Sequence, residues 1–178
     1  MRTGRDRGFT LVEMMISLVV LAILIVVGAP AFSELIKNNR MLSNVYAIRA
    51  ALNGSRSEAL AQRTPVTLCR SQNGTSCSAG DWNVGFIAFL DVNEDGVVDD
   101  PNDEPIFLSK VIDNDSLVIT YDSGDLVQFN SRGYVANGTQ GILTVCDDRG
   151  DDDARGLAIT RGGLVKAVED PNDLAACP

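Results

Sequence analysis

The sequence predicts an α+β protein in which one long N-terminal helix packs on an antiparallel β domain. Residues 14–29 form an apolar run that only Ser17 and Gly28 interrupt, and an amphipathic helical pattern continues over residues 31–62. After Pro65 the apolar residues occur in short runs separated by Gly, Asn and Asp, as in strands joined by tight turns. Too few residues remain for crossover helices, so we expect the strands to be antiparallel.

The first apolar segment is long enough to cross a membrane. It runs from Phe9 to Ala29, 21 residues with the single charge Glu13, and about 20 apolar residues span a bilayer core as a helix. Arginines before the segment favour a cytoplasmic start and an external C-terminal domain. Three interpretations fit so far: a secretory signal peptide cleaved near Ala29-Pro30-Ala31, an uncleaved signal anchor, or a prepilin that keeps its apolar segment.

Glu13 distinguishes these interpretations. A carboxylate inside an apolar helix costs a few kcal/mol to insert, and such residues are usually functional. A signal peptide that is discarded has no use for one. Because Glu13 stands five residues into a chain that begins at Phe9, directly behind a short basic leader, the third interpretation is favoured.

The stretch Arg7-Gly8-Phe9-Thr10-Leu11-Val12-Glu13 resembles the class III signal of type IV prepilins and type II secretion pseudopilins. The resemblance implies that a prepilin peptidase cleaves after Gly8 and methylates the new N-terminus at Phe9. It also implies that Glu13 pairs with the terminal amine of a neighbouring subunit during assembly, so that two groups costly in lipid offset each other.

These implications divide the chain into four parts. Residues 1–8 are the leader, residues 9–30 a transmembrane and fibre-core helix, residues 31–63 an amphipathic helix and residues 64–178 a periplasmic β-rich domain. Pro30 lies where pilins often carry a helix-loosening proline, and its missing N–H predicts a kink. The protein is then expected in the inner membrane as a single-pass protein, and later in a pilus or pseudopilus.

The amphipathic helix carries one apolar stripe with alternating spacings of four and three residues. Its members are Met41, Val45, Ile48, Leu52, Ser55 and Ala59. We expect this stripe to pack on the β domain, and Thr64-Pro65 to end the helix.

Eight strands are expected in the β domain. They are Val66–Cys69, Gly85–Leu90, Ile106–Leu108, Leu117–Tyr121, Leu126–Phe129, Gly141–Val145, Gly156–Thr160 and Leu164–Val168.

The order of motifs over most of the chain resembles the GspH/FimT branch of minor pilins and pseudopilins. The motifs are Ala51–Ala59, Val66–Cys69, Trp82–Phe86, Phe89–Gly96, Phe129–Gly133 and Val145–Asp147. The resemblance implies the type IV pilin fold and a minor pilin at the pilus tip or in the priming complex, supporting pilus assembly and twitching motility or adhesion. The alternatives it leaves are a GspH-type pseudopilin of type II secretion and a DNA-binding minor pilin for natural transformation. The expected partners are other major and minor pilins or pseudopilins and the prepilin peptidase.

The charge of the chain opposes nucleic-acid binding. Its formal net charge is −9, and the leader alone is positive by two charges, which leaves −11 after Gly8. Phosphate backbones are bound by Lys and Arg. Arg155, Arg161 and Lys166 could serve a DNA-binding subunit, but aspartates flank them, so nucleic acid is not the expected partner.

The four cysteines predict disulfides. The chain has no histidine and no Cys-x-x-Cys pair, which argues against zinc and thiol redox chemistry. An exported domain reaches an oxidising compartment where cysteines form disulfides, and four cysteines can be paired in three ways. The favoured one joins Cys69 to Cys77 around a short loop and Cys146 to Cys177 at the C-terminal tail; the alternative is free buried thiols.

One acidic segment has the spacing of a calcium loop. Asp91, Asn93, Asp95 and Asp99 place oxygen ligands at positions one, three, five and nine, with Gly96 at position six. Position twelve is asparagine instead of the usual glutamate, and no helix flanks the loop. The alternative is therefore an acidic turn between two strands, and no other cofactor is expected. Five aspartates between residues 147 and 153 are interpreted as a solvated loop.

Nothing in the sequence predicts catalysis. Histidine is absent, and neither a Gly-x-Ser-x-Gly elbow nor a phosphate-binding glycine loop occurs. We therefore expect a structural subunit and not an enzyme.

Overall fold

The computed structural model describes residues 8–100, 102–112 and 117–177. One helix, α1, runs from Leu11 to Gln62 and is followed by eight strands and three short 3-10 turns. The chain divides into two compact units, residues 1–40 and 41–178, and α1 contributes to both.

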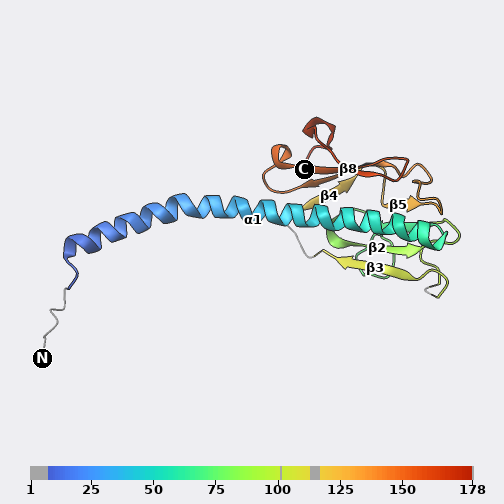
Figure 1. The fold of residues 1–178 in the computed structure, drawn as a ribbon, viewed down its shortest axis with the longest axis horizontal. Helices are drawn as coiled ribbons and strands as arrows, with labels where there is room; N and C mark the ends of the chain where they lie inside the picture. The colour runs from blue at the N-terminus through green and yellow to red at the C-terminus, as the bar shows by residue number, and fades with distance from the viewer. Residues whose placement is uncertain (1–7, 101, 113–116, 178) are drawn as a thin grey trace, which may run out of the picture. The chain divides into compact units, whose positions relative to one another are not determined.

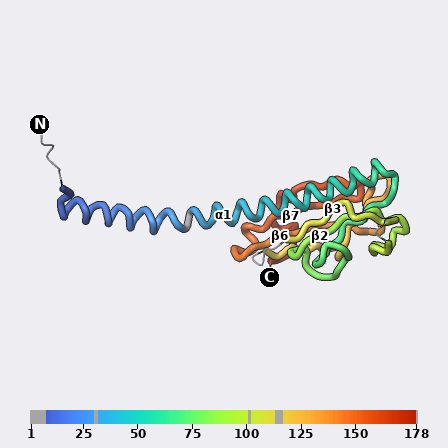
Figure 2. The backbone as a smooth tube through the Cα atoms, turned by 90° about the horizontal axis from the view of Figure 1, so that it is seen from below, coloured from blue at the N-terminus to red at the C-terminus, as the bar shows by residue number. Residues whose placement is uncertain are grey.

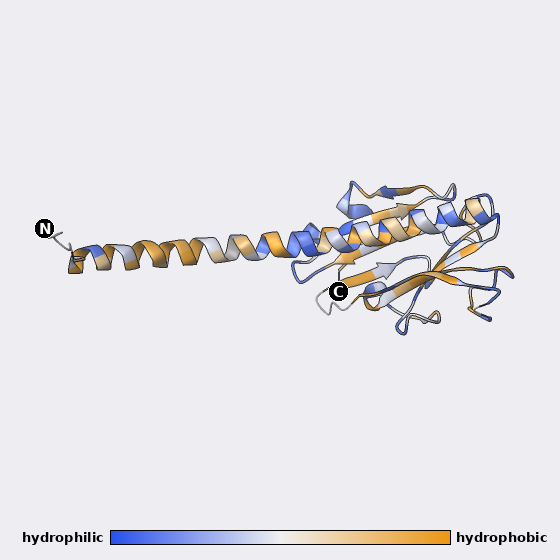
Figure 3. Cartoon of the chain, turned by 60° about the horizontal axis from the view of Figure 1, so that its bottom comes forward, coloured by the Kyte–Doolittle hydropathy of each residue, from blue (hydrophilic) through white to orange (hydrophobic). Residues whose placement is uncertain are grey.

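The first unit consists largely of the apolar part of α1. Its large apolar side chains are exposed along the whole segment, from Phe9 at 78% to Val26 at 74% and Phe32 at 66%. Figure 3 shows this part of the helix mostly in the orange of apolar residues, with a few blue and pale turns between. A helix that is apolar on every side has no stable place in water, and its composition suits a lipid environment.

The helix ends where the sequence predicts. Gln62 is its last residue, and Arg63 adopts a left-handed conformation with φ 56° before Pro65. A residue with positive φ is a common way to terminate a helix. At position 30 the backbone remains within α1. The side chain of Pro30 lies outside the described residues, and the expected kink stays a prediction.

The strands form two four-stranded antiparallel sheets (Figures 1 and 2). Sheet A has the order β3-β2-β1-β5 and sheet B the order β4-β6-β7-β8. The bounds are β1 Val66–Arg70, β2 Gly85–Leu90, β3 Ile106–Val111, β4 Val118–Tyr121, β5 Leu126–Phe129, β6 Gly141–Cys146, β7 Arg155–Ile159 and β8 Val165–Ala167. Each lies on a predicted strand, and β3 is longer than expected by three residues.

One hydrophobic core joins the helix to both sheets. All six residues of the predicted stripe are buried, including the two small ones, Ser55 and Ala59, which are both fully buried. Leu68 and Phe129 contribute from sheet A, and Leu143 from sheet B. The predicted packing of residues 41–59 on the β domain is therefore confirmed.

A second set of contacts fixes the C-terminal part of α1 to two turns of the β domain. Arg56 donates a hydrogen bond of 2.9 Å from Nε to the backbone oxygen of Gly133. Gly163, in the turn before β8, has φ +74°, and a Cβ there would lie 2.1 Å from the same oxygen. Glycine is thus required at position 163 both by conformation and by space.

Candidate functional site

The N-terminal segment contains every residue expected to act in processing and assembly. Gly8, Phe9 and Thr10 are exposed and precede the helix. Thr10 caps α1: its backbone oxygen accepts from the Met14 N–H at 3.2 Å, and its Oγ1 accepts from the Glu13 N–H at 3.2 Å. These two bonds define an N-cap residue, which satisfies one of the donors left open at a helix start.

Glu13 lies in the first turn of α1 and its side chain is exposed. Its backbone oxygen accepts a 2.7 Å hydrogen bond from Ser17 Oγ. An acidic residue in the first turn is favourably placed toward the positive end of the helix dipole. Glu13 thus follows Phe9 by four residues, in the first turn of α1 and at the start of the apolar segment.

Among the described residues, α1 is the one helix that is long and apolar enough to cross a membrane. Its apolar stretch is near the N-terminus and buries none of its surface within the chain. Within this segment Ile25, Gly28, Ala29, Phe32, Ser33 and Ile36 line a shallow apolar groove. Such a surface has to be covered by lipid or by other chains.

Both disulfides that the sequence favours are present. Cys69 of β1 is joined to Cys77, and Cys146 of β6 is joined to Cys177, leaving no free cysteine. The first closes a loop of eight residues, and the second closes one of 31 residues. Each sheet is therefore covalently linked to one loop or tail beside it.

The C-terminal tail lies against the outer side of sheet B. The Ala175 N–H donates to Thr144 Oγ1 at 3.2 Å, and the Cys177 N–H donates to Asp151 Oδ1 at 2.6 Å. A Cβ at Gly156 would lie 2.2 Å from Leu174 Cδ2, so the absence of a side chain in β7 makes room for the tail.

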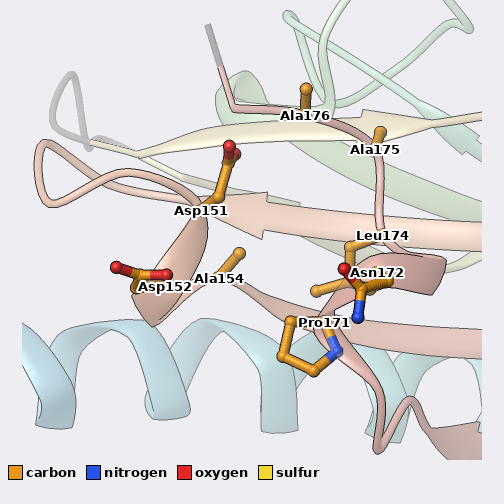
Figure 4. Close-up of a pocket in the computed structure, with 8 residues that line it drawn as sticks. All are labelled: Asp151, Asp152, Ala154, Pro171, Asn172, Leu174, Ala175 and Ala176. Carbon is orange, nitrogen blue, oxygen red and sulfur yellow. The ribbon is translucent and has the colours of Figure 1, made fainter.

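A cavity of about 240 Å³ lies between this tail and the turn at Asp151–Asp153 (Figure 4). Its lining is Asp151, Asp152, Ala154, Pro171, Asn172, Leu174, Ala175 and Ala176. Apart from two aspartates and one asparagine the lining side chains are apolar, so the cavity presents no set of acid, base and nucleophile.

The four candidate ligands of the predicted calcium loop do not all lie together. Asp91 is fully buried, and its Oδ2 accepts hydrogen bonds from Thr67 Oγ1, Gln128 Nε2 and Gly96 N at 2.6, 2.8 and 3.0 Å. Its Oδ1 is buried without a partner in the part of the chain described. Asp91 is therefore a member of the sheet A core as well as the first residue of the loop.

The other three candidate ligands gather in the exposed part of the loop. Asn93 Nδ2 donates to Asp95 Oδ2 at 2.9 Å and to Asp99 Oδ2 at 3.1 Å. Within the described residues no group of three or more His, Cys, Asp or Glu side chains is arranged to hold a metal ion. Calcium binding stays a prediction, since it needs Asn93 to turn its amide nitrogen away from the two carboxylates.

Glu104 has a role in this loop that the sequence did not predict. Its side chain is nearly buried, and the two carboxylate oxygens accept the Val92 N–H at 3.1 Å and the Asp99 N–H at 3.0 Å. The acid thus closes the loop from position fourteen, two residues beyond the position that carries the glutamate in the usual calcium loop. An acid shortly after that position is the sequence signal for this role.

The basic residues considered for DNA binding are exposed but are not gathered at one place. Arg155 begins β7, Arg161 follows its other end, and Lys166 pairs with Ala158 in the middle of the sheet edge. The two arginines are thus separated by about 20 Å of chain.

The aspartates between residues 147 and 153 form ion pairs with an arginine inside the same segment. Arg149 pairs with Asp147 at 2.7 Å and with Asp153 at 3.3 Å.

Comparison with known proteins identifies the family. A family model described as "Type II transport protein GspH" matches residues 45–163, more than half of the chain. This chain belongs to the GspH family. A second model, described as a prokaryotic N-terminal methylation motif, matches residues 3–29 of this GspH-family chain. A search among curated proteins found no match.

Two solved structures share the fold of this GspH-family protein, both of the type IV minor pilin FimU from Pseudomonas aeruginosa strain PAO1. One crystal form matches with a TM-score of 0.59 and 20% identity, over 76% of this chain and 92% of FimU. Another matches with a TM-score of 0.56 and 19% identity, over 74% and 94%. At this identity the likeness shows the fold, and the fold is that of a type IV pilin.

Proposed function

We propose that this GspH-family chain is a minor pilin of a type IV pilus, placed near the tip or in the priming complex. The observation that carries the proposal is the exposed apolar start of α1, with Glu13 as the acid of its first turn, joined to a β domain of the FimU fold. In this proposal the helix is stored in a membrane and later buried among the helices of other pilin subunits in a fibre, where its apolar surface is covered. The protein acts by assembling and not by catalysis.

In this proposal the prepilin peptidase removes residues 1–8 in the inner membrane and methylates Phe9. The β domain then stands in the periplasm, where both disulfides form. Glu13 pairs with the terminal amine of the neighbouring subunit, so each charge gains a partner in an apolar environment. Other pilins are the partners.

The deciding experiment is the N-terminal sequence and intact mass of the protein isolated from native membranes and from sheared pili. A chain that begins at Phe9 and is heavier by one methyl group, present in the pilus fraction, supports the proposal. A chain that begins near Phe32 indicates a cleaved secretory signal and overturns it.

A second candidate is a pseudopilin of type II secretion, which the description of the matching family model favours. The same processed chain would serve either machine. Deletion of the gene distinguishes them: loss of surface pili with normal secretion supports the minor pilin, and loss of secreted enzymes with normal pili supports the pseudopilin.

A further inference from the structure

The position at which α1 begins determines the conformation of the bond expected to be cleaved. The helix starts at Leu11, so the Gly8–Phe9 bond lies in non-helical, exposed chain. Thr10 fixes this start through its two hydrogen bonds to the N–H groups of Met14 and Glu13. The boundary thus depends on a side chain and not only on the low helix propensity of Gly8.

Moving the boundary by two residues would involve the scissile carbonyl itself. In an α-helix each N–H bonds to the carbonyl four residues before it. If the helix began at Phe9, Gly8 would become the cap residue, and its carbonyl would accept the Val12 N–H. That carbonyl would then be held in the first helical turn, and hydrolysis of the Gly8–Phe9 bond would first require the turn to open.

We infer that Thr10 is a positioning residue for leader removal. Its hydroxyl keeps the start of α1 at Leu11, two residues after Phe9, so the Gly8–Phe9 bond stays outside the helix and the Gly8 carbonyl stays free of helical hydrogen bonding. This inference rests on the proposed function, in which a prepilin peptidase cleaves after Gly8. Thr10 does not take part in the hydrolysis.

The test compares cleavage of the full-length chain and its variants in detergent by purified prepilin peptidase, following the mass of the product. Thr10→Val has nearly the same shape and lacks the acceptor, whereas Thr10→Ser keeps it. Ser17→Val is the matched control, because it removes a hydroxyl from the same helix one turn beyond Glu13. Trp82 is buried in the β domain, and its fluorescence checks that all variants are folded.

Thr10→Val is expected to lower kcat/KM about three- to ten-fold, the ratio that corresponds to the loss of one helix cap. Thr10→Ser and Ser17→Val are expected to remain within about two-fold of the parent chain. Amide hydrogen exchange of Val12 should become slower in Thr10→Val alone, because the Val12 N–H would then bond to the Gly8 carbonyl. Parental cleavage of Thr10→Val overturns the inference and leaves the proposed function intact. Failure of the parent chain to be cut after Gly8 overturns the proposed function, and this inference with it.

Discussion

The hydroxyl of Thr67 donates a 2.6 Å hydrogen bond to Oδ2 of Asp91, and both residues are fully buried. The bond joins β1 to the residue that directly follows β2. Gln128 of β5 donates to the same oxygen. One carboxylate thus connects three strands of sheet A to the loop that begins at Asp91.

Replacement of Asp91 by alanine is expected to lower the free energy of unfolding by about 3 kcal/mol, because three buried donors lose their acceptor. Urea unfolding of the full chain in detergent, without calcium, measures this. Asp152→Ala is the control, since Asp152 is exposed and distant in sequence, and it should change stability by less than about 0.5 kcal/mol. Equal effects of the two substitutions would contradict the role assigned to Asp91.

Calcium is expected to raise the thermal unfolding midpoint when present at about 1 mM, the range in which extracellular calcium modules bind. The carboxylates of Asp95 and Asp99, which now accept hydrogen bonds from the Asn93 amide nitrogen, would instead bind the ion together with backbone carbonyls of the loop. Asp99→Asn removes one charged ligand and should abolish the rise, whereas Asp152→Asn should leave it unchanged. If the midpoint does not respond to calcium, or responds equally in Asp99→Asn, the loop is an acidic turn.

The two disulfides are expected to contribute unequally to stability. In the chain-entropy account a closed loop of 31 residues stabilises by about 3.5 kcal/mol and one of eight residues by about 2.5 kcal/mol. Double alanine variants of each pair, unfolded in urea without reductant, test the order. A larger loss from the Cys69–Cys77 pair would show that packing around the sulfurs outweighs loop length.

Tyr121 is expected to make stability depend on alkaline pH. Burial of the ring raises the pKa of its phenol well above the usual 10.0, and the neighbouring carboxylate of Asp122 raises it further. The hydroxyl also donates to the backbone oxygen of Thr139. The folded state holds this proton more tightly than the unfolded state. The contribution of Tyr121 to the free energy of unfolding is therefore fully present below pH 10 and is lost as the pH rises beyond it.

The measurement is urea unfolding at a series of pH values from neutral to strongly alkaline, followed by Trp82, whose ring lies edge-on to Tyr121 with centroids 6.1 Å apart. Tyr121→Phe should be less stable near neutral pH and should lose much of the decline above pH 10. A decline of equal size in Tyr121→Phe would assign the alkaline dependence to other groups.

Local patterns in the sequence predicted the elements of this fold. The stripe from Met41 to Ala59 was readable because buried positions on a helix repeat every three or four residues. Strand positions followed from short apolar runs between turn residues. The order of the strands in the sheets could not be predicted from the sequence. For example, β1 pairs with β5 although more than fifty residues separate them, and no local signal specifies such a pairing.

The candidate site was only partly predictable for the same reason. Gly8, Phe9 and Glu13 form a contiguous motif, so the residues themselves carried the prediction. The cap at Thr10 was not predicted, although a threonine three residues before a glutamate at the start of an apolar run is a known signature of a helix start. The burial of Asp91 was not, because its donors come from Thr67 and Gln128, far away in sequence.

The continuity of α1 across Arg40 and Met41 has a mechanical consequence. Tension applied to the apolar segment enters the globular unit through the helix itself. There it meets the buried stripe over residues 41–59, nearly 30 Å of packed helix, and the Arg56–Gly133 bond near its far end. The helix would have to slide past both sheets at once, so these contacts are sheared together and not peeled apart one by one. A subunit built in this way resists withdrawal of its helix while its two sheets remain folded.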